Sequence, residues 1–68
     1  MKPVSGKDLC RILAAKGWTC KRINGSHHIY TKPGHPQRIS VPVHGNQTLK
    51  QGLQNALMKS AGLTEKDI

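Results

Sequence analysis

The sequence of 68 residues is poor in acidic side chains. It holds three Asp and Glu against eleven Lys and Arg, for a formal net charge of +8. The acids are Asp8, Glu65 and Asp67, and none lies between Leu9 and Thr64. An enzyme that holds magnesium needs clustered carboxylates. The sequence therefore argues against a magnesium-dependent nuclease, and its charge makes a polyanion the first partner to consider.

Aromatic residues are also scarce, with one Trp, one Tyr and no Phe. Domains that bind RNA by stacking bases on exposed rings need more of them. The sequence has no secretory signal and no apolar run long enough to cross a membrane. Cys10 and Cys20 form no CxxC pair, and we expect both to be small buried side chains. These features predict a cytoplasmic protein with no membrane segment and no cofactor.

The length allows one domain, which we take to span residues 1–68. A domain of this size buries only about 60% of the surface that its unfolded chain exposes. We therefore expect a compact core and no deep substrate cavity. The basic residues are spread along the chain, which favours a folded charged surface over a disordered arm.

A first helix is predicted from Gly6, because Ser5 and Asp8 have the spacing of a capping box with Asp in place of Glu. Its apolar stripe consists of Leu9, Ile12 and Leu13. Gly17 can take the left-handed position that ends the helix, after which Trp18 folds back onto it. We therefore expect Trp18 to be a core residue and not a platform for bases.

Three strands follow. They are predicted over Thr19–Ile23, Ser26–Lys32 and Arg38–Val43, with a tight turn at Asn24-Gly25 and a longer loop over Lys32–Gln37. Pro42 cannot donate a hydrogen bond to a neighbouring strand, so the third strand is at an edge or ends there.

A second helix is predicted after the turn His44-Gly45-Asn46. Its buried face is expected to hold Leu49, Leu53, Ala56, Leu57 and Ser60. Two starts are open, one with Thr48 as the cap and a later one at Gly52. The helix should end with Gly62 and Leu63, before a short turn over residues 64–67.

The order α-β-β-β-α predicts an α+β fold with a three-stranded antiparallel sheet. Both helices are expected on one face, and the other face is expected to be open to solvent. Double-stranded-RNA-binding modules use this architecture and read the shape and phosphates of RNA. The cations expected on or beside the sheet, and therefore able to contact phosphates, are Lys21, Arg22, Lys32 and Arg38.

Several segments share a further likeness. They are Leu9–Trp18, Asn24–Tyr30, Ile39–Pro42 with His44-Gly45, Leu49–Gly52 and Met58–Thr64. In this order and spacing they resemble the HicA family of toxin mRNA interferases. The Gly-Ser-His block and the Ala-Gly-Leu ending carry most of the likeness. Leu53 departs from the family pattern, in which Thr more often follows the Gly, and this departure concerns only the start of the second helix.

The resemblance implies the toxin of a type II toxin–antitoxin system, a ribonuclease with one essential histidine and a HicB-like antitoxin that covers the site. The family motif maps most directly onto His27. His28 is the alternative, because some relatives carry the histidine one residue later. The other residues expected to contact RNA are Ser26, His28 and His44.

Strand geometry bears on the choice between the two histidines, because neighbours on a strand point to opposite faces. If Ile29 faces the helices, His27 shares its side and His28 shares the open face with Tyr30. A ligand across the open sheet would then meet His28, whereas one held at the edge by the turn and the start of the first helix would meet His27. RNA supplies its own nucleophile, so one imidazole among cations suffices for cleavage. We favour His27.

Two other interpretations are weighed against this one. A zinc site of His27, His28, His35 and His44 is disfavoured, because adjacent histidines diverge and no Cys lies among them. A double-stranded-RNA-binding module without catalysis is the alternative function.

Overall fold

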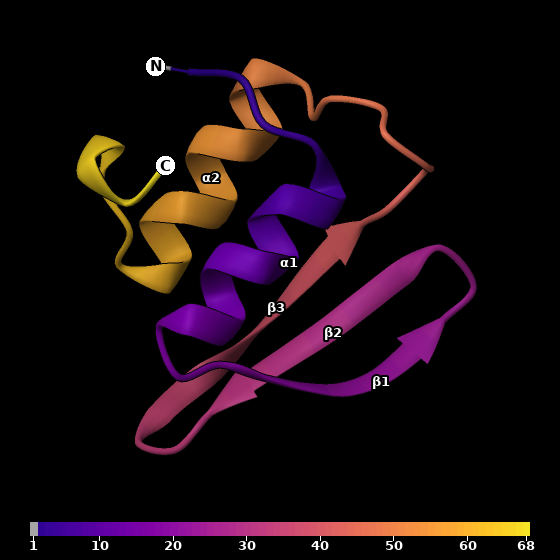
Figure 1. Cartoon of the computed structure of the whole chain (residues 1–68). Coiled ribbons are helices and arrows are strands. Elements are labelled where there is room, and N and C mark those ends of the chain that lie inside the picture. Colours follow the sequence, from indigo (N-terminus) through magenta and orange to yellow (C-terminus); the bar gives the residue numbers. More distant parts are fainter. Residues whose placement is uncertain (1) are drawn as a thin grey trace.

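The computed structural model describes residues 2–68. Its elements are α1 (Gly6–Ala15), β1 (Thr19–Asn24), β2 (His27–Lys32), β3 (His35–Pro42), α2 (Gln51–Ala61) and the short 3-10 helix η1 (Glu65–Asp67). The strands form one antiparallel sheet in the order β1-β2-β3. The predicted α-β-β-β-α order is therefore confirmed, and it is consistent with a double-stranded-RNA-binding-domain-like fold (Figure 1).

Helix α1 begins where its cap predicted. The Ser5 hydroxyl accepts a hydrogen bond from the Asp8 amide at 3.0 Å, while the Asp8 carboxylate pairs with Arg11 at 3.4 Å. Gly17 then takes a φ of 94°, and the Trp18 amide donates to the Leu13 carbonyl at 3.0 Å. This turn brings Trp18 back into the core, where only 3% of its surface is exposed.

One face of the sheet carries the core. Tyr30 of β2 lies opposite Ile39 of β3, and His28 lies opposite Val41. Directly opposed residues share a face. Because Tyr30, Ile39 and Val41 are all buried, their side of β2 and β3 is the side that the helices cover. The core cluster also includes Leu9, Leu13, Trp18, Met58 and Leu63.

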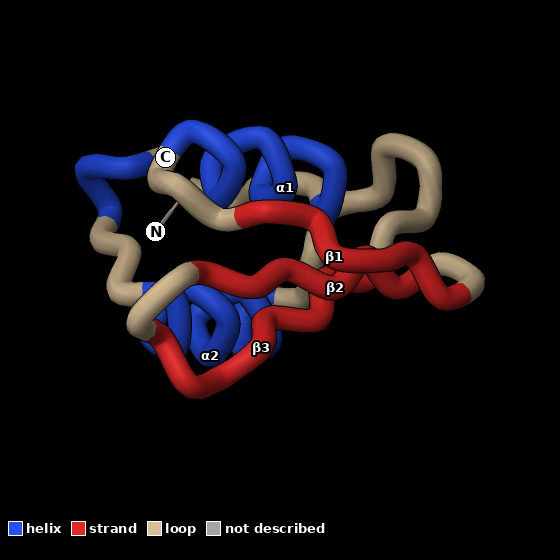
Figure 2. Tube along the Cα trace, turned by 90° about the horizontal axis from the view of Figure 1, so that it is seen from below, coloured by secondary structure: helices blue, strands red, loops and turns tan. Residues whose placement is uncertain are grey.

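The helices cover the sheet unevenly. Helix α1 lies near β1 and β3, whereas α2 lies along β3, and the β1–β2 hairpin extends past both helices (Figure 2). Every residue of β1 is exposed. Cys10 is buried as predicted, but the prediction that Cys20 is buried is wrong, because Cys20 lies on this uncovered strand.

Both hairpin turns differ from their predicted positions. Asn24 pairs with His27, so the first turn is Gly25-Ser26 and not Asn24-Gly25. Gly25 has a φ of 63°, and no described residue other than glycine has a positive φ. A glycine at the first central position of a two-residue hairpin is typical of a type II′ turn. Asn24 then lies in the strand and does not need a positive φ.

The second turn is shorter than predicted. Lys32 pairs with His35, so Pro33-Gly34 closes a tight hairpin and β3 begins at His35 instead of Arg38. Gly34 has a φ of 80°, and Pro followed by such a Gly suits a type II turn. Pro36 is accommodated because β3 is an edge strand with a register shift opposite Tyr30 and Lys32.

Helix α2 begins at Gln51 after Lys50, so neither predicted start, Thr48 or Gly52, is correct. The predicted buried face is confirmed at Leu49, which is buried, and at Leu57, which packs against the core, but it is wrong at its other positions. Leu53 is 40% exposed, whereas Gln54 and Met58 are buried. The error arises because Leu49, on which the predicted stripe was aligned, precedes the helix.

Gln54 is a polar residue in that buried face. Its Oε1 accepts from the Val4 amide at 3.0 Å, and its Nε2 donates to the Lys2 carbonyl at 2.7 Å. The predicted end of α2 is confirmed, because Gly62 has a φ of 71° and Leu63 is buried. The short turn predicted after it is the 3-10 helix over residues 65–67. No helix within residues 2–68 has the length and apolar character needed to span a membrane.

Candidate nucleic-acid interface

The first hairpin turn is tied to the end of the third strand. The Val43 amide donates to the Ser26 carbonyl at 2.7 Å. Gly6, at the start of α1, also lies directly against the Pro42 carbonyl. The turn, the end of β3 and the start of α1 therefore form one corner of the molecule, and the two adjacent histidines lie in it.

The two histidines point to opposite faces of the sheet. His28 lies between Ile23 and Val41 on the helix side and is half-buried. His27 lies between Asn24 and Pro42 on the open side and is exposed. The assumption that Ile29 faces the helices is wrong, because Tyr30 does so instead. The faces expected for His27 and His28 are therefore exchanged.

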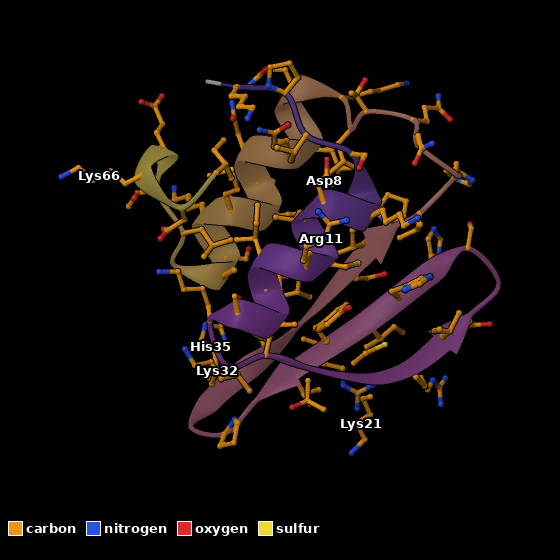
Figure 3. All side chains as sticks on the ribbon, in the orientation of Figure 1. Asp8, Arg11, Lys21, Lys32, His35 and Lys66 are labelled. Carbon is orange, nitrogen blue, oxygen red and sulfur yellow. The ribbon has the colours of Figure 1, made fainter. Side chains whose placement is uncertain are left out.

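The open face carries two arginines beside His27. Arg22 lies opposite Ile29, and Arg38 alternates with the buried Ile39, so both share the side of His27. Both arginines are exposed. Lys21 lies at the register shift between Cys20 and Arg22, and its side chain points away from the helices (Figure 3). The structure thus brings three of the predicted cations onto or beside one surface.

Lys32 belongs to a different cluster at the opposite end of the sheet. It pairs with His35 on the helix side, and the two side chains lie beside the end of α1 (Figure 3). The Lys32 Nζ lies 6.0 Å from the Trp18 ring centroid, and the His35 ring centroid lies 4.7 Å from it. His35 was predicted in a loop but begins β3. This cluster packs around the buried indole and does not adjoin His27.

His44 lies in the loop after β3, as predicted, and it lines an open groove of about 480 Å³. The lining residues are Pro42, His44, Gln47, Thr48, Leu49, Lys50 and Leu53. Sequence reasoning missed this groove, because it assigned both leucines to the buried face of α2. The sequence signal that could have found it is the close spacing of Leu49, Lys50 and Leu53, which lie where the loop ends and α2 begins.

The buried polar groups under the hairpin hold their protons. Burial raises the pKa of the Tyr30 hydroxyl, and a hydrogen bond with Cys10 raises it further. Burial also raises the pKa of the Cys10 thiol. Both groups therefore stay protonated at neutral pH, whereas an imidazole can give and take protons there.

The described side chains form no metal site. Within residues 2–68 no group of three or more His, Cys, Asp or Glu lies close enough to hold an ion. The four histidines weighed as zinc ligands are spread over the open face, the helix side, the far end of the sheet and a loop.

The chain was compared with protein-family models and with curated proteins, and only the first comparison gave a match. A family model described as HicA toxin of bacterial toxin-antitoxin matches residues 6–63. That range runs from the first residue of α1 to the buried Leu63 after α2. No curated protein matches the chain.

Proposed function

The chain belongs to the HicA toxin family of bacterial toxin–antitoxin systems, and on that premise we propose that it is a metal-independent endoribonuclease that cleaves mRNA in the cytoplasm with a single histidine. The observation that supports this most is the composition of the open face. His27, Arg22 and Arg38 share it and are exposed. None of the three carboxylates in the sequence lies on these strands.

RNA supplies the nucleophile for this reaction. The 2′-oxygen attacks the adjacent phosphorus, its bond to phosphorus forms, and the bond to the 5′-oxygen breaks. His27 accepts the 2′-hydroxyl proton and returns a proton to the departing 5′-oxygen. Arg22 and Arg38 stabilise the extra negative charge that the phosphorane carries. The phosphate backbone provides most of the affinity, with Lys21 and Ser26 at the margins of the face.

His28 is the alternative catalyst. It is half-buried beside Ile23, on the side from which α1 approaches the hairpin. RNA bound around the edge of the hairpin would meet His28, whereas RNA bound across the open face meets His27. We favour His27 because the two arginines share its face.

A HicB-like antitoxin is the proposed inhibitor. The chain carries a formal charge of +8, so an acidic partner would associate rapidly and neutralise the surface that binds RNA. Covering the hairpin would also remove His27 from solvent.

The test is cleavage of a generic transcript by the purified chain in the presence of a chelator. His27→Ala should lower the cleavage rate by about 10²- to 10⁴-fold, the usual contribution of a proton-transfer group. RNA binding and thermal unfolding should stay close to those of the unmodified chain, because His27 is exposed.

His28→Ala is the matched control. Full activity of His27→Ala together with loss of activity in His28→Ala would identify the other imidazole as the catalyst. Tight RNA binding by the unmodified chain with no cleavage would favour the non-catalytic double-stranded-RNA-binding module.

A further inference from the structure

The groove beside His44 is not used by the proposed cleavage reaction. It opens between the end of β3 and the start of α2 and has a volume of about 480 Å³. Clefts that take ligands commonly measure about 300–1,000 Å³. The groove is thus large enough for one or two side chains of a bound protein.

The lining of the groove combines an apolar floor with a cationic rim. Pro42, Leu49 and Leu53 supply the apolar part. Leu53 is one of the two large hydrophobic residues that are exposed within residues 2–68. Lys50 is exposed on the rim. None of the described lining residues is a carboxylate. This chemistry suits an apolar side chain flanked by acidic groups.

The groove is continuous with the candidate nucleic-acid interface. Pro42 lines the groove and lies directly opposite His27 in the sheet. Residues opposed in this way lie about 5 Å apart between their Cα atoms. A protein anchored in the groove would therefore reach His27 without crossing any other element.

Other occupants fit less well. A second copy of the chain also carries +8, so two copies repel each other. The described ends of the chain lie together elsewhere, since Lys2, Pro3, Val4 and Ile68 line a separate hollow. RNA could use the donors of the rim, but its phosphates would leave the apolar floor of Pro42, Leu49 and Leu53 without an apolar partner.

We propose that this groove is a docking site for the antitoxin, which inserts an apolar side chain against Leu53 and sets carboxylates beside Lys50. The proposal rests on the proposed function only in that the antitoxin must cover the cleavage site. The inserted side chain would bury apolar surface against Leu53, so shortening Leu53 to a polar residue should remove part of the binding free energy.

The experiment measures the affinity between the chain and the product of the adjoining antitoxin reading frame by titration calorimetry. Leu53→Ser should weaken the complex by about tenfold or more, and Leu53→Met should restore most of the affinity. Ala56→Ser changes an exposed residue of the same helix outside the groove and should leave affinity unchanged.

A second pair of variants tests the rim. Lys50→Gln should weaken the complex more than Lys66→Gln, because each removes one charge and only Lys50 lines the groove. Equal effects would show that net charge alone acts, and would overturn the proposal.

The other possible outcomes also decide whether the docking proposal stands. An unmodified chain that does not bind the antitoxin, or a Leu53→Ser variant that binds as tightly, overturns the proposal. Loss of RNA binding in Leu53→Ser would assign the groove to RNA. A dimer of the unmodified chain that Leu53→Ser dissociates would assign it to a second copy. Absence of cleavage by the free chain would count against the proposed function and leave the affinities interpretable.

Discussion

The two sides of β2 differ in how far they are buried. On the helix side Tyr30 is buried against Ile39, and on the open side His27 is exposed near Arg22. The residues of the two sides alternate along one strand. Substitutions on the helix side should therefore act on the free energy of unfolding, and substitutions on the open side should act on RNA. Adjacent positions in the sequence can thus be tested separately.

The largest expected effect is on the helix side. A Cβ on Gly6 would collide with the Pro42 carbonyl oxygen, where the start of α1 meets the end of β3. Because that neighbour is backbone, it cannot move aside cheaply. We expect Gly6→Ala to lower the free energy of unfolding by about 3 kcal/mol, measured by urea denaturation.

Gly52→Ala is the matched control, because a Cβ there meets no atom within 4 Å and the residue lies within α2. We expect it to raise the free energy of unfolding by up to about 1 kcal/mol. If Gly6→Ala were as stable as the unmodified chain, the close contact between α1 and β3 would be refuted.

A smaller effect is expected on the open side. Arg38→Gln should weaken binding to all RNA sequences alike and reduce the slope of log affinity against log salt by about 1. It should change the free energy of unfolding by no more than about 0.5 kcal/mol, because Arg38 is exposed.

Lys66→Gln removes the same charge from η1, where the side chain points away from the sheet (Figure 3). Filter binding at several salt concentrations compares the two variants. An equal loss in both would mean that total charge, and not the open face, determines affinity.

The smallest expected effect concerns neither side of the sheet. The Lys16 ammonium lies 2.8 Å from the Asp67 carboxylate, and this hydrogen bond holds the Asp67 pKa below its usual value, helped by the Thr64 amide. A pKa lowered in the folded state stabilises the fold above the unfolded value, about 3.9 for Asp. This contribution is lost as the pH falls through the folded-state pKa.

Asp67→Asn should therefore leave a chain whose stability falls less between pH 5 and pH 2, although it is slightly less stable at pH 7. Thermal unfolding across that range measures the difference. Lys16→Gln should give a similar profile, and a steeper acid loss in Asp67→Asn would contradict the assignment.

Features set by neighbouring residues were predictable. Ser5 caps α1, Gly17 turns Trp18 into the core, and Gly62 ends α2 before Leu63. Each depends on backbone preferences and hydrogen bonds within a few residues. The family resemblance also follows from local motifs, and the matching family model supports it.

Features set by distant contacts were not predictable. The burial of Gln54 depends on hydrogen bonds to Val4 and Lys2, about fifty residues earlier. The groove requires that Pro42 and Leu53 come from two different elements.

The sequence by itself determined the charge, the order of the elements and the pairing of two imidazoles beside a tight turn. Alternation along β2 also required that His27 and His28 diverge. Only the tertiary structure decided which of them faces solvent. Both Ile29 and Tyr30 are apolar enough to face a core, so the pattern leaves two choices. The position of α1 and α2 over Tyr30, Ile39 and Val41 selects one, because the face that buries more apolar surface is the one the helices cover.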